Sequence, residues 1–180
     1  MRTYALRGAA VAGATVLATL ASTLPAAADT RTFADRAGDT GIAADITTVT
    51  VTNGSTPSGR VSVRAHVGHL TPGDLVTVWF DTVPGDPGPE YKLAVYANAG
   101  GQSLRKLESF GQAGTVVPCD GIRGRADAFG PDVVSVSVPR SCLQNPHRVR
   151  VSLRARFASG EHAVTDWAPA KRHFFGWVHS

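Results

Sequence analysis

The sequence predicts an all-β fold, either a sandwich or a barrel, and three observations lead to it. Apolar and polar side chains alternate in many short segments, with the period of a half-buried strand. Turn signals rich in Gly and Pro separate these segments, and helical periodicity is hard to find after residue 30. No repeat or linker divides residues 29–180, so we expect one domain there.

Residues 1–28 have the features of a cleavable signal peptide. Arg2 and Arg7 supply the positive start, an apolar stretch rich in Ala and Thr follows, and "LPAAADT" offers a cleavage site after Ala28. The alternative is a membrane anchor, but the apolar run of about 16 residues is shorter than the roughly 20 that a spanning helix needs. We therefore expect a secreted protein with no stable membrane insertion after cleavage.

Seven segments show the alternation of a strand. In the clearest, residues 148–157 ("RVRVSLRARF"), Val149, Val151, Leu153, Ala155 and Phe157 share the face expected to be buried. The others are residues 46–53, 60–67, 74–81, 91–97, 104–110 and 132–139, and residues 171–178 are a weaker eighth candidate. A short helical turn is expected at residues 140–145, where Ser141 would cap it and Cys142 would be held.

The segment 74–81 differs from the others because both of its faces carry apolar side chains. Such a strand is usually central and covered on both sides. Alternatively, the second face is open, and Trp79 then offers a flat platform on which a sugar ring stacks.

Two cysteines remain in the expected mature chain, Cys119 and Cys142. An even, minimal count in an exported protein predicts one disulfide, because secreted chains meet an oxidising compartment. Closing this loop stabilises the fold by roughly 3 kcal/mol in the chain-entropy model. A thiolate metal site is disfavoured, since the CxxC spacing and further Cys ligands are missing.

Three aspartates, Asp35, Asp39 and Asp45, lie in a glycine-broken loop ahead of the strand at 46–53. Calcium takes six to eight oxygen ligands, so these carboxylates with loop carbonyls and water form a candidate calcium site. The alternative is that they accept backbone N–H bonds in turns. The sequence leaves both interpretations open.

A second acidic group, Asp81, Asp86 and Glu90, follows the strand at 74–81. If strand order brings it beside the first group, six carboxylates converge and a metal site is favoured. Otherwise this segment is an acidic loop exposed to solvent. Apart from a structural calcium ion, we expect no cofactor.

The charge of the chain argues against nucleic acid as a partner. Cleavage after Ala28 removes Arg2 and Arg7, so that the formal charge falls from +4 to about +2. That bias is too weak for a protein that neutralises many phosphates. The outward Arg residues at 148, 150, 154 and 156, with Arg60 and Arg64, form a candidate basic face for acidic wall polymers or phospholipid headgroups, or a solvent-exposed strand face.

The sequence contains no strong catalytic motif. There is no GxSxG elbow, and neither cysteine is expected to be free. Glu161, His162 and Asp166 in "EHAVTDWAP" form a weak hydrolase triad that solvent-side residues explain equally well. We expect that the protein is not an enzyme.

Several motifs resemble known families. "FADRAGD…DI" at 33–46, "DT…PGPEY" at 81–91, "VPRSCL" at 138–143 and "DWAP" at 166–169 resemble a group of secreted actinobacterial β-sandwich proteins with no assigned function. The opening Asp35, Gly38, Asp39 and Asp45 also resemble, more weakly, DOMON and family 9 carbohydrate-binding modules. This likeness implies a jelly-roll-like sandwich that binds a sugar or haem, some members with structural calcium. Haem is disfavoured because Met1 is the only methionine.

Together these observations predict a single-domain antiparallel β-sandwich, jelly-roll-like, with about seven to nine strands and a Cys119–Cys142 disulfide. The expected function is non-catalytic binding of an extracellular ligand, with glycan the first candidate. The alternatives are an envelope or extracellular protein-interaction or inhibitor protein, whose disulfide-braced residues 119–142 would form the contact loop, and a hydrolase.

Overall fold

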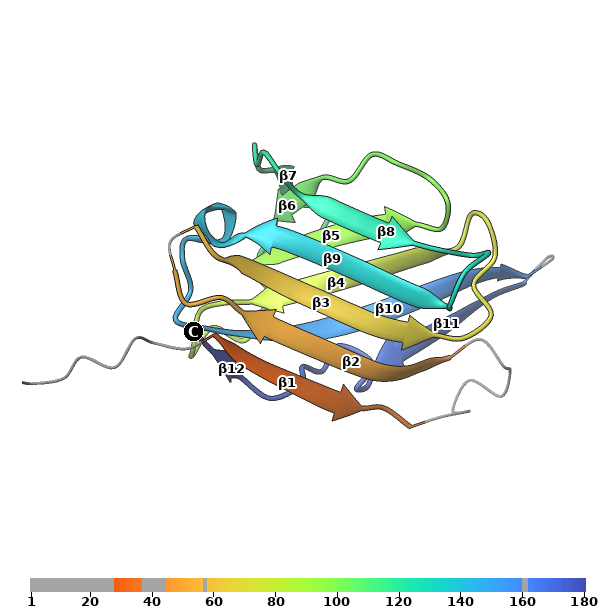
Figure 1. Cartoon of the computed structure of the whole chain (residues 1–180), viewed down its shortest axis with the longest axis horizontal. Helices are drawn as coiled ribbons and strands as arrows, with labels where there is room; N and C mark the ends of the chain where they lie inside the picture. The colour runs from red at the N-terminus through yellow and green to blue at the C-terminus, as the bar shows by residue number, and fades with distance from the viewer. Residues whose placement is uncertain (1–27, 37–44, 57, 160–161) are drawn as a thin grey trace, which may run out of the picture.

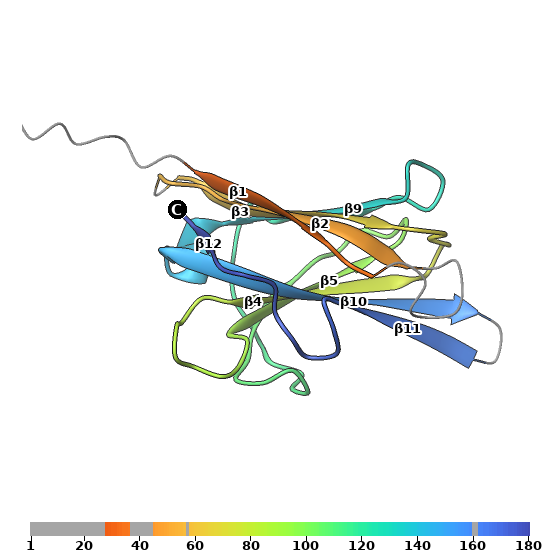
Figure 2. The same ribbon diagram turned by 90° about the horizontal axis from the view of Figure 1, so that it is seen from below.

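The chain folds into two antiparallel sheets that pack face to face, as the two layers in Figure 2 show. The structure is a computed structural model that describes residues 28–36, 45–56, 58–159 and 162–180. The five-stranded sheet contains, in spatial order, β1 (Asp29–Ala34), β2 (Ile46–Asn53), β3 (Arg60–Val67), β9 (Val133–Pro139) and β8 (Arg123–Ala126).

The seven-stranded sheet forms the second layer (Figures 1 and 2). Its spatial order is β11 (His162–Ala168), β10 (Arg148–Ser159), β4 (Leu75–Asp81), β5 (Tyr91–Tyr96), β6 (Leu104–Lys106) and β7 (Thr115–Val116), and β12 (Val178–His179) also pairs with β10. The connections β3–β4, β7–β8 and β9–β10 cross between the sheets. These elements confirm the expected β-sandwich.

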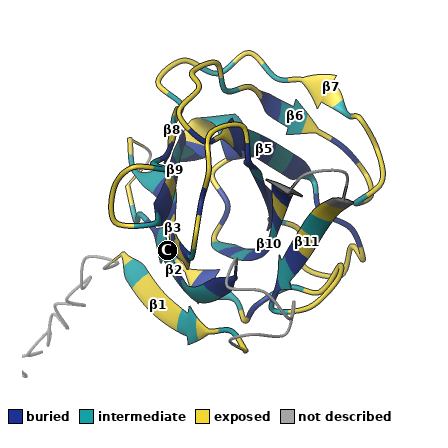
Figure 3. Cartoon of the chain, turned by 90° about the vertical axis from the view of Figure 1, so that its right-hand side faces the viewer, coloured by how far each residue is buried: buried dark blue, intermediate teal, exposed yellow. Residues whose placement is uncertain are grey.

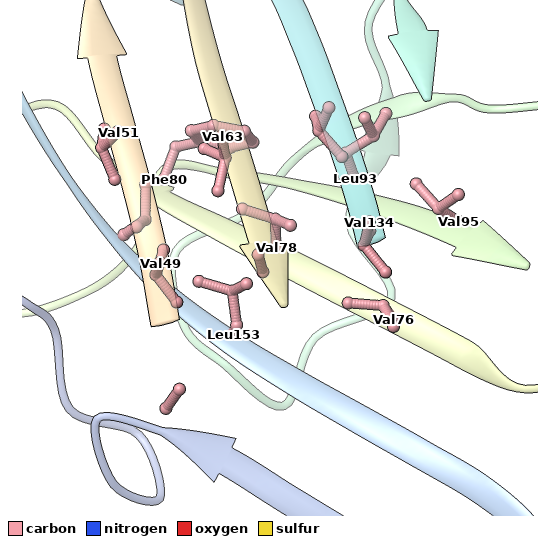
Figure 4. Close-up of a cluster of buried hydrophobic side chains, with 14 of the residues drawn as sticks. Val49, Val51, Val63, Val76, Val78, Phe80, Leu93, Val95, Val134 and Leu153 are labelled. Carbon is pink, nitrogen blue, oxygen red and sulfur yellow. The ribbon is translucent and has the colours of Figure 1, made fainter. Parts of the chain in front are cut away.

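The hydrophobic core lies between the two sheets. Figure 4 shows Val49 and Val51 of β2 and Val63 of β3 opposite Val78 and Phe80 of β4. Seen from the side, the buried residues line the inside of the sandwich (Figure 3). The apolar face expected for residues 148–157 is confirmed, because all five of its apolar side chains are buried.

All seven segments expected as strands form strands, although β6 ends at Lys106 instead of residue 110. Of the weaker eighth segment, only its end enters β12. The pattern did not reveal β1, β7, β8 or β11. β7 has two residues and β8 has four, including Gly124, so both are too short to show a period.

The predicted helical turn is a 3-10 helix, Arg140–Leu143, which contains Cys142. Ser141 does not cap it, since Pro139 occupies the cap position and makes no side-chain cap bond. Cys142 joins Cys119 across a Cα–Cα distance of 5.7 Å, which confirms the predicted disulfide. Such bonds persist in oxidising compartments.

Candidate functional site

The first acidic group lies where β1 ends and β2 begins. The Asp35 amide donates to the Thr47 carbonyl at 2.9 Å, and the buried Asp45 accepts the Gly68 amide on its own carbonyl at 2.8 Å. Asp39 lies outside the residues that the structure describes. The calcium site that needs all three therefore stays a prediction.

In the second acidic group, each side chain has a partner of its own. Glu90 Oε2 accepts the Thr82 amide at 2.5 Å and the Thr82 hydroxyl at 3.0 Å, and so fixes the start of the loop. Asp86 is exposed and accepts the Gly88 amide at 3.4 Å. Asp81 is 0% exposed and forms an ion pair of 2.6 Å with Arg150.

Burial governs the acidity of this group. It raises the pKa of Asp81, and the hydrogen bond and charge of Arg150 oppose that rise. Burial also raises the pKa of Glu90, where the Thr82 amide opposes it. Glu90 thus holds the start of the β4–β5 loop through Thr82, and Asp81 joins β4 to Arg150 on β10.

Among the described residues, Asp45 of the first acidic group lies far from Asp81 of the second, so the structure does not support the conditional expectation of six carboxylates in one place. In the strand register, Asp81 lies opposite Arg150 of β10, and Asp166 lies opposite Ala155 of the same strand. Asp166 marks the place of the first acidic group, because it accepts the amide of Ile46, the residue after Asp45. Positions 150 and 155 are roughly 16 Å apart along an extended strand. Within the described residues, no three His, Cys, Asp or Glu side chains gather so that they could hold a metal ion.

Asp166 of the candidate hydrolase triad points into the sandwich. It is buried, and its Oδ2 accepts the Ile46 amide at 2.7 Å, which ties β11 to the start of β2. Glu161 and the side chain of His162 are outside the described part of the chain. What the structure shows of Asp166 is therefore a structural contact between the two sheets.

Trp79 belongs to an aromatic cluster on the outer side of the seven-stranded sheet. It is 2% exposed, so it is not an open platform, and the covered alternative for β4 is confirmed. Trp167 of β11 stacks on Trp79, with ring centroids 5.0 Å apart and planes 15° apart. Phe110 packs against Trp79 and Trp167, and Phe174 against Phe110. We call these four residues the aromatic cluster.

Two connections bring the covering rings to the sheet. Phe110 comes from the β6–β7 connection and Phe174 from the segment between β11 and β12, and both connections lie below the lower layer in Figure 2. Arg150 lies over the Phe174 ring, with 4.9 Å from its guanidinium carbon to the ring centroid. Arg154 lies over the rings of Trp79 and Trp167, with 5.3 and 5.6 Å from its guanidinium carbon to the two ring centroids.

A pocket of about 310 Å³ opens beside the aromatic cluster. We call it the tryptophan pocket. Its aromatic walls are Trp79, Phe110 and Trp167, and its cations are Lys92, Arg154 and Arg172. The remaining lining residues are Leu75, Thr77, Ala94, Gly111 and Gln112, and none of the lining residues is acidic.

The positive charges of the tryptophan pocket repel one another. Burial lowers the pKa of Lys92, and the charges of Arg105 and Arg154 lower it further. Burial likewise lowers the pKa of Arg154, with a contribution from Arg156. The Lys92 ammonium donates to the Gln112 carbonyl at 2.5 Å, a neutral acceptor. An anion in the pocket would relieve this repulsion.

Three polar atoms at this place are buried without a hydrogen-bond partner among the described residues: Trp79 Nε1, Ser152 Oγ and Arg154 Nε. Ser152 is directly opposite Trp79 in the β10–β4 pairing, and Arg154 is next along the same face of β10. Buried polar groups are normally satisfied. Their concentration beside the pocket is the pattern expected where a polar ligand or solvent completes the bonding.

The arginines expected on one basic face occupy two separate faces, which is a second correction. Arg150, Arg154 and Arg156 project from the outer side of the seven-stranded sheet, and Arg60 and Arg64 from that of the five-stranded sheet. The alternation of polar and apolar residues correctly predicts that these arginines face outward from their own strands. It does not predict which of the two sheets each strand joins.

Sequence reasoning did not find Lys92, Phe110 or Arg172 as pocket residues. Lys92 lies opposite Trp79 on β5, but this requires the β4–β5 register to be known. Phe110 and Arg172 reach the pocket from loops, which carry no periodic signal.

Fold and site define a disulfide-bonded β-sandwich with a cationic aromatic pocket on one sheet. Comparisons with protein-family models, curated proteins and solved structures gave no significant match. The resemblances drawn from the motifs therefore stay predictions. No helix within the described ranges has the length and apolar character needed to span a bilayer.

Proposed function

We propose that the protein is a secreted, non-catalytic module that binds an acidic sugar residue of an extracellular glycan in the tryptophan pocket. The observation that carries the proposal is the combination of aromatic walls with three cations and no carboxylate. The half-buried Phe110 and Trp167 supply an apolar surface for the ring face of a sugar, whereas Trp79 is covered. Arg and Lys recognise a carboxylate through charge-assisted hydrogen bonds.

The size and construction of the tryptophan pocket support a small ligand unit. Its volume of about 310 Å³ is at the lower end of the range for small-molecule sites, so one sugar ring is a better fit than an extended segment. Trp79 Nε1 and Arg154 Nε are buried beside the pocket without a hydrogen-bond partner among the described residues, so a ligand oxygen or a solvent molecule placed next to them would complete their bonding. The rigid strands β4, β10 and β11 carry Trp79, Arg154 and Trp167, which favours a preorganised site.

The two alternative functions receive less support. Residues 119–142 would be the contact surface of an inhibitor, but β8 with four residues and β9 with seven tie part of this segment into the five-stranded sheet. The hydrolase alternative needs Asp166 in an accessible cleft, and its carboxylate is buried against β2.

The test is a titration with galacturonate and glucuronate oligomers, read by tryptophan fluorescence, with neutral oligomers of the same length as the comparison. We expect Arg172→Gln and Arg154→Gln each to weaken binding of the acidic oligomer about tenfold, which corresponds to about 1.4 kcal/mol. The reason is the loss of one charge-assisted bond to the carboxylate.

Arg156→Gln is the matched control. Arg156 is exposed, belongs to the same strand and face as Arg154, and does not line the tryptophan pocket. The affinity of Arg156→Gln for the acidic oligomer should stay within about twofold of that of the native protein. Equal binding of neutral and acidic oligomers, or no fluorescence change with either, would rule out the proposed ligand.

A further inference from the structure

The outer side of the five-stranded sheet carries a groove of about 400 Å³. Most of its lining side chains are arginines or carry a hydroxyl, and we call it the arginine–hydroxyl face. The arginines are Arg64, Arg123 and Arg125, and the hydroxyls are Thr50, Thr52, Ser62, Ser135 and Ser137. The other lining residues are Val63, Gly124 and Val136, so the groove holds no carboxylate.

The strand register arranges these side chains in two parallel rows. One row runs Thr52, Ser62, Ser137 and Arg123 across β2, β3, β9 and β8, and the next runs Thr50, Arg64, Ser135 and Arg125. Arg64 and Arg125 are two strands apart, or about 10 Å, and Arg123 and Arg125 are about 7 Å apart along β8. The cations are therefore spread along the face at a spacing that several charges of one chain can match.

Bonds within the sheet hold part of this face in place. Ser62 and Ser137 hydroxyls lie 3.0 Å apart, and Arg60 donates from Nε to Ser137 Oγ at 2.6 Å and from Nη2 to the Gly121 carbonyl at 2.6 Å. Burial lowers the pKa of Arg60, and the charge of Arg123 lowers it further. Arg60 thus adds positive charge next to the groove.

The positive charge of the face is only partly balanced. Arg125 pairs with Asp127 at 2.6 Å, and that guanidinium is largely exposed. Arg64 and Arg123 are exposed and make no side-chain hydrogen bond or ion pair with the rest of the described chain. Two full charges thus remain available on a rigid sheet.

We propose that the arginine–hydroxyl face binds an extended acidic polysaccharide, whose carboxylates or sulfates contact Arg64 and Arg123 and whose hydroxyls contact the Ser and Thr rows. Charge complementarity selects a polyanion. The five hydroxyls both donate and accept, which suits a polyhydroxylated chain. The groove contains no aromatic side chain on which nucleic-acid bases stack and no exposed apolar side chain that enters a membrane.

This surface is independent of the proposed function. The tryptophan pocket lies on the outer side of the other sheet, so the core of the sandwich separates the two. The pocket takes one sugar residue, whereas the arginine–hydroxyl face takes several consecutive residues of a chain. Failure of one proposal therefore leaves the other standing.

Binding of polygalacturonate, measured by isothermal titration, tests the inference. We expect Arg64→Gln/Arg123→Gln to weaken polymer binding at least tenfold, because two charge-assisted contacts are lost. The control, Arg31→Gln/Arg156→Gln, removes the same charge from exposed positions outside the groove and should change affinity less than about threefold. Binding should also weaken with added salt, because exposed charges are screened.

Two further measurements separate the possible results. In Arg64→Gln/Arg123→Gln, the fluorescence response to short uronate oligomers should be unchanged, since the tryptophan pocket is intact, and the melting temperature should match the native protein. The inference is overturned if the control pair loses as much affinity as the groove pair, or if the native protein does not bind the polymer. Stronger binding of single-stranded DNA or anionic phospholipid vesicles than of the polysaccharide also overturns it.

Discussion

Replacing Arg150 with methionine is expected to lower the free energy of unfolding by about 3–5 kcal/mol. Asp81 is 0% exposed, and Arg150 is its ion-pair partner at 2.6 Å, so the substitution leaves a buried carboxylate without a countercharge. Methionine keeps apolar contact with the Phe174 and Trp177 rings over which Arg150 lies. The loss therefore reports the charge and not the packing.

The deficit of Arg150→Met should depend on pH in a defined direction. Burial already raises the pKa of Asp81 above its ordinary 3.8, and without Arg150 that pKa rises further. Between 3.8 and the raised pKa, the folded state binds more protons than the unfolded state, so lowering the pH stabilises the fold relative to the unfolded chain. The difference between the native protein and Arg150→Met should therefore shrink as pH falls from 7 toward 4.

Urea unfolding at several pH values measures this effect. Asp81→Leu/Arg150→Met should recover most of the lost stability, because it removes the buried charge along with its partner. Arg156→Met, at an exposed position of the same strand, should change stability by less than about 0.5 kcal/mol. A deficit in Arg150→Met that is the same at pH 7 and pH 4, or a double variant no better than the single one, would contradict the account.

The second large effect is expected from the disulfide. Cys119→Ser/Cys142→Ser should lose about 3 kcal/mol of stability, because the bond closes a loop with a sequence separation of 23 and so restricts the unfolded chain. The bond also joins the β7–β8 connection to the 3-10 helix after β9, which fixes a crossing between the sheets.

Thermal unfolding with and without a reducing agent provides the measurement. The native protein should fall to the stability of the serine variant when reduced, while the serine variant should not respond to reduction. A native protein whose melting temperature is insensitive to full reduction would show that the bond contributes nothing to stability.

How far the sequence predicts this fold depends on the length of each strand. Residues 148–157 alternate over ten positions, and their buried face was predicted correctly because a strand of that length shows its period. β8, with four residues, and β7, with two, fold as strands because neighbouring strands supply their hydrogen bonds. β11 was interpreted through Asp166 as a candidate catalytic segment, yet it pairs with β10 over seven positions.

The candidate sites show the same division. The disulfide between Cys119 and Cys142 could be predicted from the number of cysteines and the expected oxidising compartment alone, since two cysteines allow one disulfide. The tryptophan pocket could not be predicted without the order of the strands, because Trp79, Lys92 and Trp167 come from three strands and Phe110 from a loop. A sequence pattern states which side of its own strand a residue occupies, but neighbours across a sheet are set by register.

By itself, the sequence determined the fold class, the disulfide and the alternation of each long strand, because these depend on local periodicity and composition. The tertiary structure alone decided that Arg64 and Arg154 lie on opposite outer faces, that Trp79 is covered by Phe110 and Trp167, and that Asp81 meets Arg150. The physical reason is that both sheets present the same alternation, so only the pairing of strands distant in sequence assigns each polar face to a sheet.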